Sequence, residues 1–468
     1  MTDIVICILP KINPDAPTVG PAVLKSHLLA NGIKCEVVDF NVLLFNELKN
    51  HDRHNYYYFE NDVIFNTQHD GVITDEFSQF YTTYFYIFLD WIETLKSKNT
   101  EWIGLSLLSD YSLAIAIKLS ELIRIHIPKA KIVWGGGQVS GSTRPFRNSG
   151  LIDHYIAGDS EFALVELLKG NTEYSGINSG QGIQIKDLNS VMLPNYDDIN
   201  WDLYGFLDYN RPAYITGSRG CVKRCTFCNV YDIWPEYKFR SAKSIVSEIT
   251  YVREKYRRIT FRFTDSLING SMKAFREMLH ALKEHRKTDL VLSWTSQWII
   301  RSKSQMPEDD YRLMAESGCI ELEIGIESFS QPVRYHMGKK FTDEDMWWCF
   351  DMLQKYKIPH TMLMIVGYPT ETTDDHQHTI NTIKELHRRG YMHNTNSMGS
   401  PLMYLRFTNT LMLHAGQPLW DIVNHNIKNY KSVTDWDYND NTSDVRISRI
   451  NELNNLVMEL QETLPPTE

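Results

Sequence analysis

The chain lacks a hydrophobic run long enough to cross a membrane. Its longest aromatic and aliphatic stretch, Tyr84 to Trp91, is short and is interrupted by Asp90, whereas a membrane-spanning helix needs about 20 consecutive apolar residues. A secretory signal segment is also absent. We therefore expect a cytoplasmic protein with no membrane partner, in a compartment that keeps thiols reduced.

An excess of basic charge and two common motifs are also missing. The 58 acidic residues outnumber the 48 lysines and arginines, and this negative balance disfavours nucleic acid as a partner. No Gly-x-Gly-x-x-Gly follows the first apolar strand pattern, which argues against a nicotinamide cofactor. His376 and His378 do not have the spacing of a metalloprotease motif.

Cysteine is sparse, and three of the seven cysteines lie in one loop. Cys221, Cys225 and Cys228 are separated by three residues and then by two. Three thiolates at this spacing can hold three irons of an iron–sulfur cube and leave the fourth iron without a protein ligand. An open metal position is a place where a substrate or cofactor can bind, so the loop is interpreted as catalytic.

Two other interpretations of the three cysteines stay open. A structural zinc site would need a fourth cysteine or histidine nearby, and the next cysteine is the distant Cys319. A disulfide would suit a secreted chain, but the number of cysteines is odd and no signal segment precedes them. Both interpretations are disfavoured.

The spacing Cys-x3-Cys-x2-Cys, with Phe227 just before the third cysteine, resembles the signature of the radical S-adenosylmethionine (SAM) enzymes. By this resemblance, Cys221, Cys225 and Cys228 would ligate a [4Fe–4S] cluster whose free iron binds the amino and carboxylate groups of SAM. One electron, received from an external donor such as flavodoxin or ferredoxin, would cleave the sulfonium and release a 5′-deoxyadenosyl radical. The protein would bind, orient and shield these cofactors.

Strand-like and helix-like patterns alternate downstream of these cysteines. Strands are predicted around residues 259–263, 290–294, 319–327 and 360–366, with helices between them, one of which begins at Thr342 with Asp345 as its capping-box partner. Such a βα repeat folds into a right-handed, partly or fully closed parallel barrel. In the strand 319–327, glutamates alternate with apolar residues, so Glu321, Glu323 and Glu327 should face the barrel interior, where a cationic cofactor would supply partners. For Glu321, a strand end in contact with water is the alternative.

Other barrel residues resemble SAM-binding motifs. Gly325 to Ser328 resembles the Gly-Ile-Glu-Ser motif, Met337-Gly338-Lys339 a Met-x-Lys, and Gly367 to Thr372 the Gly-x-Pro-Gly-Glu-Thr turn near the adenine, with Thr370 in place of the usual glycine. Asp265 and Ser266 stand where relatives hold the amino group of SAM, and Arg301 could pair with its carboxylate; a structural role is the alternative for these three. The implied SAM contacts are Phe227, Asp265, Ser266, Arg301, Gly325, Glu327, Ser328, Gly367 and Pro369.

The first third of the chain predicts a separate α/β domain. Strand patterns at residues 3–9, 34–40, 102–108, 132–134 and 153–157 alternate with helices, which is typical of a Rossmann-like, doubly wound parallel sheet that binds ligands at the carboxyl ends of its strands. An insertion at residues 51–98 is dense in aromatics. These aromatics either form a helix packed into the core or cover a bound cofactor or the substrate's entrance.

Two loops of this domain resemble the cobalamin-binding domain. They contain Ser106 and Leu108, which match Ser-x-Leu, and Gly135-Gly136-Gly137, which matches Gly-Gly. The glycines would let the backbone approach the nucleotide tail of the corrin closely, and the serine would hydrogen-bond its dimethylbenzimidazole. The Asp-x-His-x-x-Gly element that ligates cobalt in other cobalamin proteins is absent, as in many radical relatives. A domain that keeps the fold but has lost the corrin is the alternative.

We therefore expect an α/β protein with four parts. Residues 1–170 form the cobalamin-binding-like domain, 171–210 a linker rich in small and polar residues, 211–400 a partial (β/α)6 barrel of the TIM type, and 401–468 a small, mostly helical C-terminal element. A second iron–sulfur cluster is not expected, because only Cys319 and Cys349 follow the motif. A methylthiotransferase is disfavoured, because only Cys7 and Cys35 precede it.

By resemblance, the expected reaction is cobalamin-dependent methylation of an unactivated carbon in a small-molecule or peptide-type substrate. An isomerase, epimerase or cyclase that abstracts hydrogen without methyl transfer is the alternative enzyme. A non-catalytic iron–sulfur redox sensor would not need the elements at Gly325 to Ser328 and Gly367 to Thr372, so their presence counts against that third class.

Overall fold

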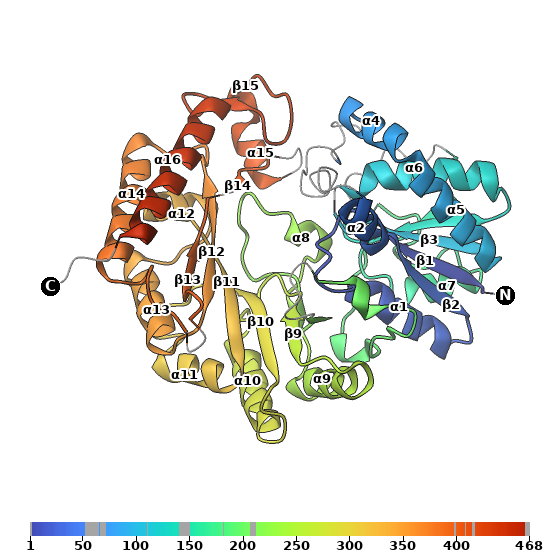
Figure 1. Ribbon diagram of the computed structural model, residues 1–468, viewed down its shortest axis with the longest axis horizontal. Coiled ribbons are helices and arrows are strands. Elements are labelled where there is room, and N and C mark those ends of the chain that lie inside the picture. Colours follow the sequence, from blue (N-terminus) through green and yellow to red (C-terminus); the bar gives the residue numbers. More distant parts are fainter. Residues whose placement is uncertain are drawn as a thin grey trace. The chain divides into compact units, whose positions relative to one another are not determined.

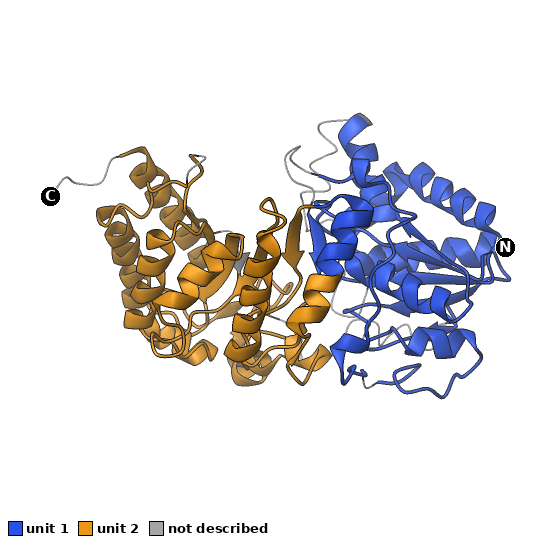
Figure 2. Cartoon of the chain, turned by 90° about the horizontal axis from the view of Figure 1, so that it is seen from below, with its two compact units in different colours: residues 1–215, 248–258 blue, residues 216–247, 259–468 orange. Residues whose placement is uncertain are grey.

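A computed structural model describes residues 2–51, 65, 72–109, 111–139, 150–180, 182–205, 212–396, 399–407, 409–413 and 417–463. The chain divides into two compact units, drawn in different colours in Figure 2. The first consists of residues 1–215 and 248–258, and the second of residues 216–247 and 259–468. Each unit is built around its own sheet.

The first unit contains a five-stranded parallel sheet of order β2-β1-β3-β4-β5 (Figure 1). All five residues of β1 are buried, as expected for a parallel strand covered by helices on both faces. This order is one of the two common doubly wound arrangements, in which ligands bind where the strand order reverses, here between β1 and β3. The predicted Rossmann-like fold is confirmed. Its elements are β1 (Ile4–Ile8), α1 (Val19–Ala30), β2 (Cys35–Asp39), α2 (Phe40–His51), α4 (Asp75–Thr83), α5 (Phe85–Lys98), β3 (Trp102–Ser106), α6 (Ser112–His126), β4 (Lys131–Gly135), β5 (His154–Tyr155) and α7 (Ala163–Leu168).

The aromatic stripe of the insertion forms part of this core. Phe77 and Phe80 of α4, and Phe88 and Trp91 of α5, are buried in one cluster with Phe40, whose ring stacks on Trp91 with 4.6 Å between centroids. The interpretation of a helix packed into the core is therefore correct for α4 and α5. The four consecutive aromatics at residues 56–59 lie outside the described residues.

The second sheet is parallel, with the strand order β13-β12-β11-β10-β9-β6, and β14 also pairs with β12. The helices between these strands cover its outer face (Figure 1). The predicted partial barrel is confirmed, and so is the capping box of Thr342 and Asp345 at the start of α13. The elements up to α14 are β6 (Ala213–Ile215), β7 (Ser218–Arg219), α8 (Val230–Ile233), β8 (Lys238–Phe239), α9 (Ala242–Tyr256), β9 (Thr260–Phe263), α10 (Met272–Arg286), β10 (Ser293–Trp298), α11 (Glu308–Glu316), β11 (Cys319–Glu327), α12 (Gln331–Met337), α13 (Asp343–Lys355), β12 (His360–Val366) and α14 (Thr373–Arg388).

The C-terminal element is mostly helical. Its long helix α16 packs against α14 of the barrel. Its elements are β13 (Met403–Leu405), β14 (Asn409–Thr410), α15 (Pro418–Val423), β15 (Ile427–Lys428), β16 (Asp437–Tyr438) and α16 (Ser443–Glu462).

One barrel strand lies further along the chain than predicted. The apolar residues Leu290 and Val291 suggested a strand at 290–294, but they are 76% and 56% exposed. The strand β10 begins at Ser293, where Trp294 and Trp298 pack under the helices. The predicted start of this strand was wrong, because the two apolar residues that suggested it are exposed at a turn.

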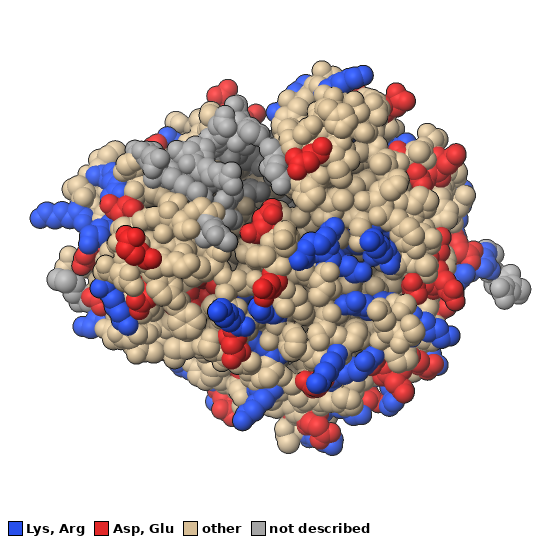
Figure 3. Space-filling model, turned by 180° about the vertical axis from the view of Figure 1, so that it is seen from behind, with Lys and Arg blue, Asp and Glu red and all other residues tan. Residues whose placement is uncertain are grey.

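The surface agrees with a chain of mixed charge. Acidic and basic side chains lie next to one another over most of the face drawn in Figure 3. Among the described residues, no helix is both long and apolar enough to span a bilayer.

Candidate functional site

The loop that carries the three cysteines begins at a backbone position that only glycine can fill. Gly220 has φ +83°, and a Cβ there would lie 2.4 Å from the carbonyl oxygen of Glu236. The thiols of Cys221, Cys225 and Cys228 are partly exposed. The other four cysteines are buried, and burial raises their thiol pKa values far above the usual range. Only the loop cysteines are therefore accessible ligands.

The three thiols lie near one another. Burial, with smaller contributions from the neighbouring thiols Cys228 and Cys221, raises the pKa of Cys225 to about 11, although the ammonium of Lys339 opposes the rise. Among the described residues, no three His, Cys, Asp or Glu side chains converge on the position of a single metal ion. A [4Fe–4S] cube does not require its ligands to converge on one metal ion, because each thiolate binds a separate iron.

The C-terminal end of α12 packs on this loop. The amide of Thr226 donates to the carbonyl of Met337 at 3.1 Å. Gly338 has φ +86°, and a Cβ there would lie 2.9 Å from the carbonyl oxygen of Arg224. The Met337-Gly338-Lys339 segment therefore supports the cysteine loop directly.

Lys339 also reaches the end of β11. Its Nζ lies 2.8 Å from Oε1 of Glu327 and 3.1 Å from the carbonyl oxygen of Gly325. A Cβ on Gly325 would lie 2.7 Å from Nζ, so the glycine makes room for this buried ion pair. Burial alone would lower the pKa of Lys339, but the carboxylate of Glu327 and the thiols of Cys225 and Cys221 together outweigh this effect, and the pKa is raised.

The interior glutamates thus have partners within the protein. Glu327 pairs with Lys339, Glu323 with Arg262, and Glu321 accepts a hydrogen bond from Thr361 at 2.9 Å. These carboxylates therefore do not need a cationic cofactor as their partner, which the sequence had led us to expect. A buried carboxylate must be compensated, and the fold compensates all three through residues distant in the sequence.

Two further expected SAM contacts also lie beside α12. The hydroxyl of Ser328 accepts from the amide of Ser330 at 3.1 Å, in the turn before α12. Phe227 is half-buried and packs against a cluster that includes Met337 and Tyr368. The ammonium of Lys339 lies 5.9 Å from the centre of the Phe227 ring.

Asp265 is buried at the end of β9, next to the half-buried Ser266. Its Oδ2 accepts from the amide of Gly217 at 2.8 Å, at the start of the segment that leads to the cysteines. Burial raises the pKa of Asp265 from 3.8 to about 7, and hydrogen bonds from Ser218 and Gly217 oppose that rise.

This shift predicts a pH-dependent stability. The folded protein keeps the proton of Asp265 up to about pH 7, whereas the unfolded chain releases it near pH 4, so stability should fall as pH rises between these values. From about pH 5.5 to about pH 8 the loss amounts to about 2 kcal/mol, and it is constant at higher pH. Urea unfolding of wild type and Asp265→Asn at both pH values checks this. An equal pH dependence in the two proteins would contradict it.

Arg301 follows β10 and lies near the cysteine loop. One of its terminal nitrogens donates to the carbonyls of Asn269 and Gly270 at 2.6 and 2.9 Å. Burial lowers the pKa of the guanidinium, while Tyr237 and the thiol of Cys221 oppose the shift. A fixed guanidinium beside Cys221 is suitably placed for a carboxylate ligand.

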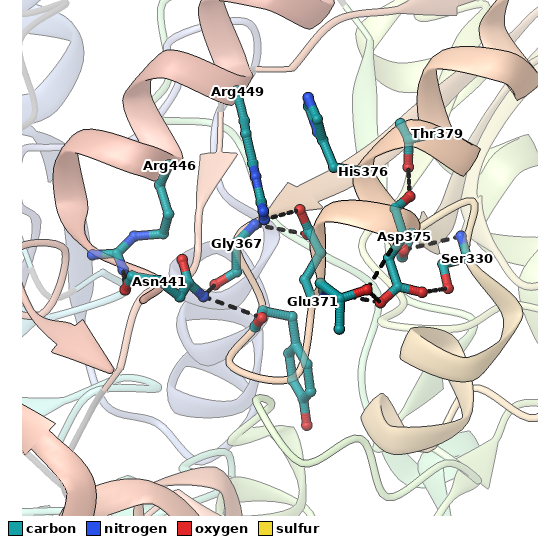
Figure 4. Close-up of polar contacts among 12 residues, drawn as sticks. Ser330, Gly367, Glu371, Asp375, His376, Thr379, Asn441, Arg446 and Arg449 are labelled. Atoms are coloured by element: carbon teal, nitrogen blue, oxygen red, sulfur yellow. Dashed lines mark hydrogen bonds and ion pairs between the residues drawn. The ribbon is translucent and has the colours of Figure 1, made fainter. Parts of the chain in front are cut away.

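The turn after β12 is held by the C-terminal element (Figure 4). Glu371 accepts from the amide of Gly367 at 2.9 Å, and Arg449 of α16 pairs with the same carboxylate at 2.8 Å. Asn441 donates to the carbonyls of Gly367 and Tyr368 at 2.8 and 3.2 Å. These contacts come from the turn's own glutamate and from residues more than 70 positions away.

Tyr368 connects this turn to the cysteine loop. Its hydroxyl lies 2.8 Å from that of Thr226, which stands between Cys225 and Phe227. Pro369 next to it is buried, and Thr370, which replaces the usual glycine, is exposed and lies 2.9 Å from a ring nitrogen of His336. No sequence signal marked Tyr368, Asn441 or Arg449, because Tyr368 occupies the variable position of its motif and the other two stand in none.

In the first unit, the two expected cobalamin loops lie side by side. Ser106 is the register partner of Gly135, and the amide of Leu107 donates to the carbonyl of Gly135 at 2.8 Å. Gly136 has φ +108°, and a Cβ there would lie 2.3 Å from the carbonyl oxygen of Leu107. Leu108 is exposed, and Ser106 and the three glycines are half-buried at the carboxyl edge of the sheet.

Comparison with known proteins gives the class of the second unit. Residues 215–383 match the model of the Radical SAM superfamily. This stretch includes all three loop cysteines and the strands β9 to β12. This stretch is a radical SAM domain, as the spacing of the cysteines predicted.

Two solved structures resemble almost the whole chain. They are TsrM from Kitasatospora setae, a radical SAM methyltransferase with cobalamin and a [4Fe–4S] cluster bound, and OxsB, a cobalamin-dependent SAM radical enzyme. TsrM gives a TM-score of 0.61 at 16% identity, over 91% of this chain and 78% of TsrM. OxsB gives 0.65 at 14% identity, over 91% of this chain and 61% of OxsB. At these identities the likeness establishes the fold.

Curated relatives include two methyltransferases. An uncharacterized methyltransferase of Pyrococcus horikoshii is 22% identical over 338 residues, which cover 68% of this chain and 70% of that protein. The cytidylyl-2-hydroxyethylphosphonate methyltransferase of Streptomyces wedmorensis is 27% identical over 189 residues, which cover 38% of this chain. The match spans 34% of the length of the Streptomyces protein.

Proposed function

We propose that the protein is a cobalamin-dependent radical SAM methyltransferase that acts on an unactivated carbon. The observation that carries this proposal is the cysteine loop, whose three accessible thiols are fixed by the end of α12 and lie near Arg301 and Lys339. Cys221, Cys225 and Cys228 would hold the [4Fe–4S] cluster. Three thiolates on one loop are a donor set that fits such a cluster.

The residues around this loop suit SAM. Arg301 would bind its carboxylate, and the turn that contains Gly367 and Pro369 would lie along its adenine. Lys339 neutralises Glu327 and so limits the negative charge beside the three thiolates. When bound, the cluster and SAM supply the radical chemistry, and cobalamin supplies a methyl carrier.

The cobalamin would bind to the first unit. Support comes from the paired loops at Ser106 and Gly135, and from their position at the carboxyl ends of β3 and β4, the edge at which doubly wound sheets bind ligands. The half-buried glycines leave the backbone open to close approach. TsrM and OxsB, which have this fold, both bind cobalamin.

Reconstitution under anaerobic conditions tests the proposal. Protein produced with cobalamin should retain a corrin, seen in its visible spectrum, and should cleave SAM when reduced. With SAM that carries a CD3 group and a metabolite extract, a product should gain that CD3 group in place of a hydrogen. SAM cleavage without CD3 transfer would favour an isomerase, epimerase or cyclase, and a cluster that does not cleave SAM would favour a redox sensor.

A further inference from the structure

The inner face of the second sheet carries a row of polar side chains. Register pairs Gln297 of β10 with Glu323 of β11, Glu323 with Thr361 of β12, and Thr361 with Tyr404 of β13. Two residues closer to the amino end of β10, Thr295 is paired with Arg262 of β9 and with Glu321 of β11. These residues share one face, because side chains in register point the same way.

This face differs from the outer face of the same strands. Outer residues such as Trp294, Leu322 and Met362 are buried under helices. On the inner face, the side chains of Arg262 and Glu323 are 36% and 25% exposed, and Gln297 is also exposed. The interior of a closed TIM barrel is filled by packed, branched apolar residues, whereas the inner face of this sheet carries polar side chains that keep part of their exposure.

One ion pair and two hydrogen bonds connect the polar groups of this face. The guanidinium of Arg262 pairs with the carboxylate of Glu323, to which Gln297 also donates at 3.4 Å. Thr361 donates to Glu321 at 2.9 Å. Apart from the Glu327–Lys339 pair, the charges on this face of the described strands are thus one guanidinium and two carboxylates.

We propose that this row is the substrate site and that it binds a free amino acid, whose carboxylate meets Arg262 and whose ammonium meets Glu321 and Glu323. The proposal rests on the proposed function, since it names the substrate class of the same barrel. A guanidinium matches a carboxylate in a bidentate fashion. On binding, Arg262 would exchange Glu323 for the carboxylate of the amino acid, and Glu323 would exchange Arg262 for the ammonium group. No buried charge would then be left without a partner.

The same charges disfavour other substrate classes. A phosphate ester with two negative charges would meet two carboxylates and only one cation, and like charges at this range are repulsive. A purely apolar substrate would strip water from three charged groups without replacing their hydrogen bonds. Four residues of strand, about 13 Å, separate Glu323 from Glu327 at the end of β11, which leaves room for an amino-acid side chain near the cofactor end.

Ligand-observed NMR on the anaerobic, cofactor-loaded protein tests this inference. The probes are the twenty common L-amino acids and the N-acetyl amide of each, which lacks both charges. At least one free amino acid should bind, and its blocked form should bind at least 10-fold more weakly. Arg262→Gln and Glu323→Gln should each weaken that binding at least 10-fold, in line with a lost hydrogen bond to a charged group. If no free amino acid binds, or if the blocked form binds equally well, the proposal is wrong.

Two controls separate recognition from structural support. Arg276→Gln removes a comparable ion pair, with Asp310 on the helical side, and should leave binding unchanged. The exchange Arg262→Glu with Glu323→Arg keeps an ion pair, so full binding by that double variant would assign the pair a structural role and overturn the proposal. SAM cleavage should also persist in Arg276→Gln. If wild type itself cleaved no SAM, the proposed function would fail independently of the binding result.

Discussion

Replacement of Cys225 by alanine is expected to abolish the iron–sulfur cluster and, with it, SAM cleavage. Cys225 stands in the middle of the loop, next to Thr226, whose amide is fixed by α12. With two thiolates left, the cube loses one of three protein ligands. Activity should fall by at least about 100-fold, because even residues that only hydrogen-bond to a metal ligand cost about 10- to 100-fold when removed. Iron and sulfide analysis and the visible spectrum of the anaerobic protein measure the cluster directly.

Cys319→Ala is the matched control. Cys319 belongs to the same unit, but it is buried at the start of β11. Its removal should cost about 1 kcal/mol of stability and leave the iron content unchanged. A cluster that survives Cys225→Ala but not Cys319→Ala would mean that the loop is not the ligand set.

Replacement of Gly367 by alanine is expected to cost about 3 kcal/mol or more of stability in the second unit. Gly367 has φ +81°, and a Cβ there would lie 2.2 Å from Cγ of Arg446. Arg446 cannot move aside easily, because it is fully buried and its guanidinium donates to the carbonyl of Asn441 at 2.9 Å. The new methyl group would therefore push the C-terminal element off the turn. Urea unfolding measures the loss.

Gly390→Ala separates strain from collision. Gly390 has φ +74°, but nothing lies within 4 Å of the position of its Cβ. This variant should lose only the cost of a left-handed alanine, about 1 kcal/mol. If both variants lost the same amount, the contact between Gly367 and Arg446 would have no energetic weight. SAM binding should weaken in Gly367→Ala alone, because only that glycine lies in the turn proposed to hold the adenine.

Much of the fold was predictable because its signals are local. The strand β11 begins and ends where the alternation of apolar and polar residues predicted, and β12 covers the predicted residues 360–366. Thr342 and Asp345 form the capping box that their spacing indicated. These patterns depend on residues a few positions apart, which the backbone geometry relates directly. β10 was misplaced because Leu290 and Val291 are apolar yet exposed, and hydrophobicity alone does not reveal which apolar residues a fold buries.

The sequence by itself determined the class of this protein, because three cysteines in one short loop are brought together by the chain that links them. Only the tertiary structure decided the partners of the charged residues. Lys339 is 12 residues from Glu327, but Arg262 is 61 from Glu323, and Arg449 is 78 from Glu371. No local periodicity relates such distant positions. A buried charge takes as its partner whichever opposite charge the packing of strands and helices brings within reach.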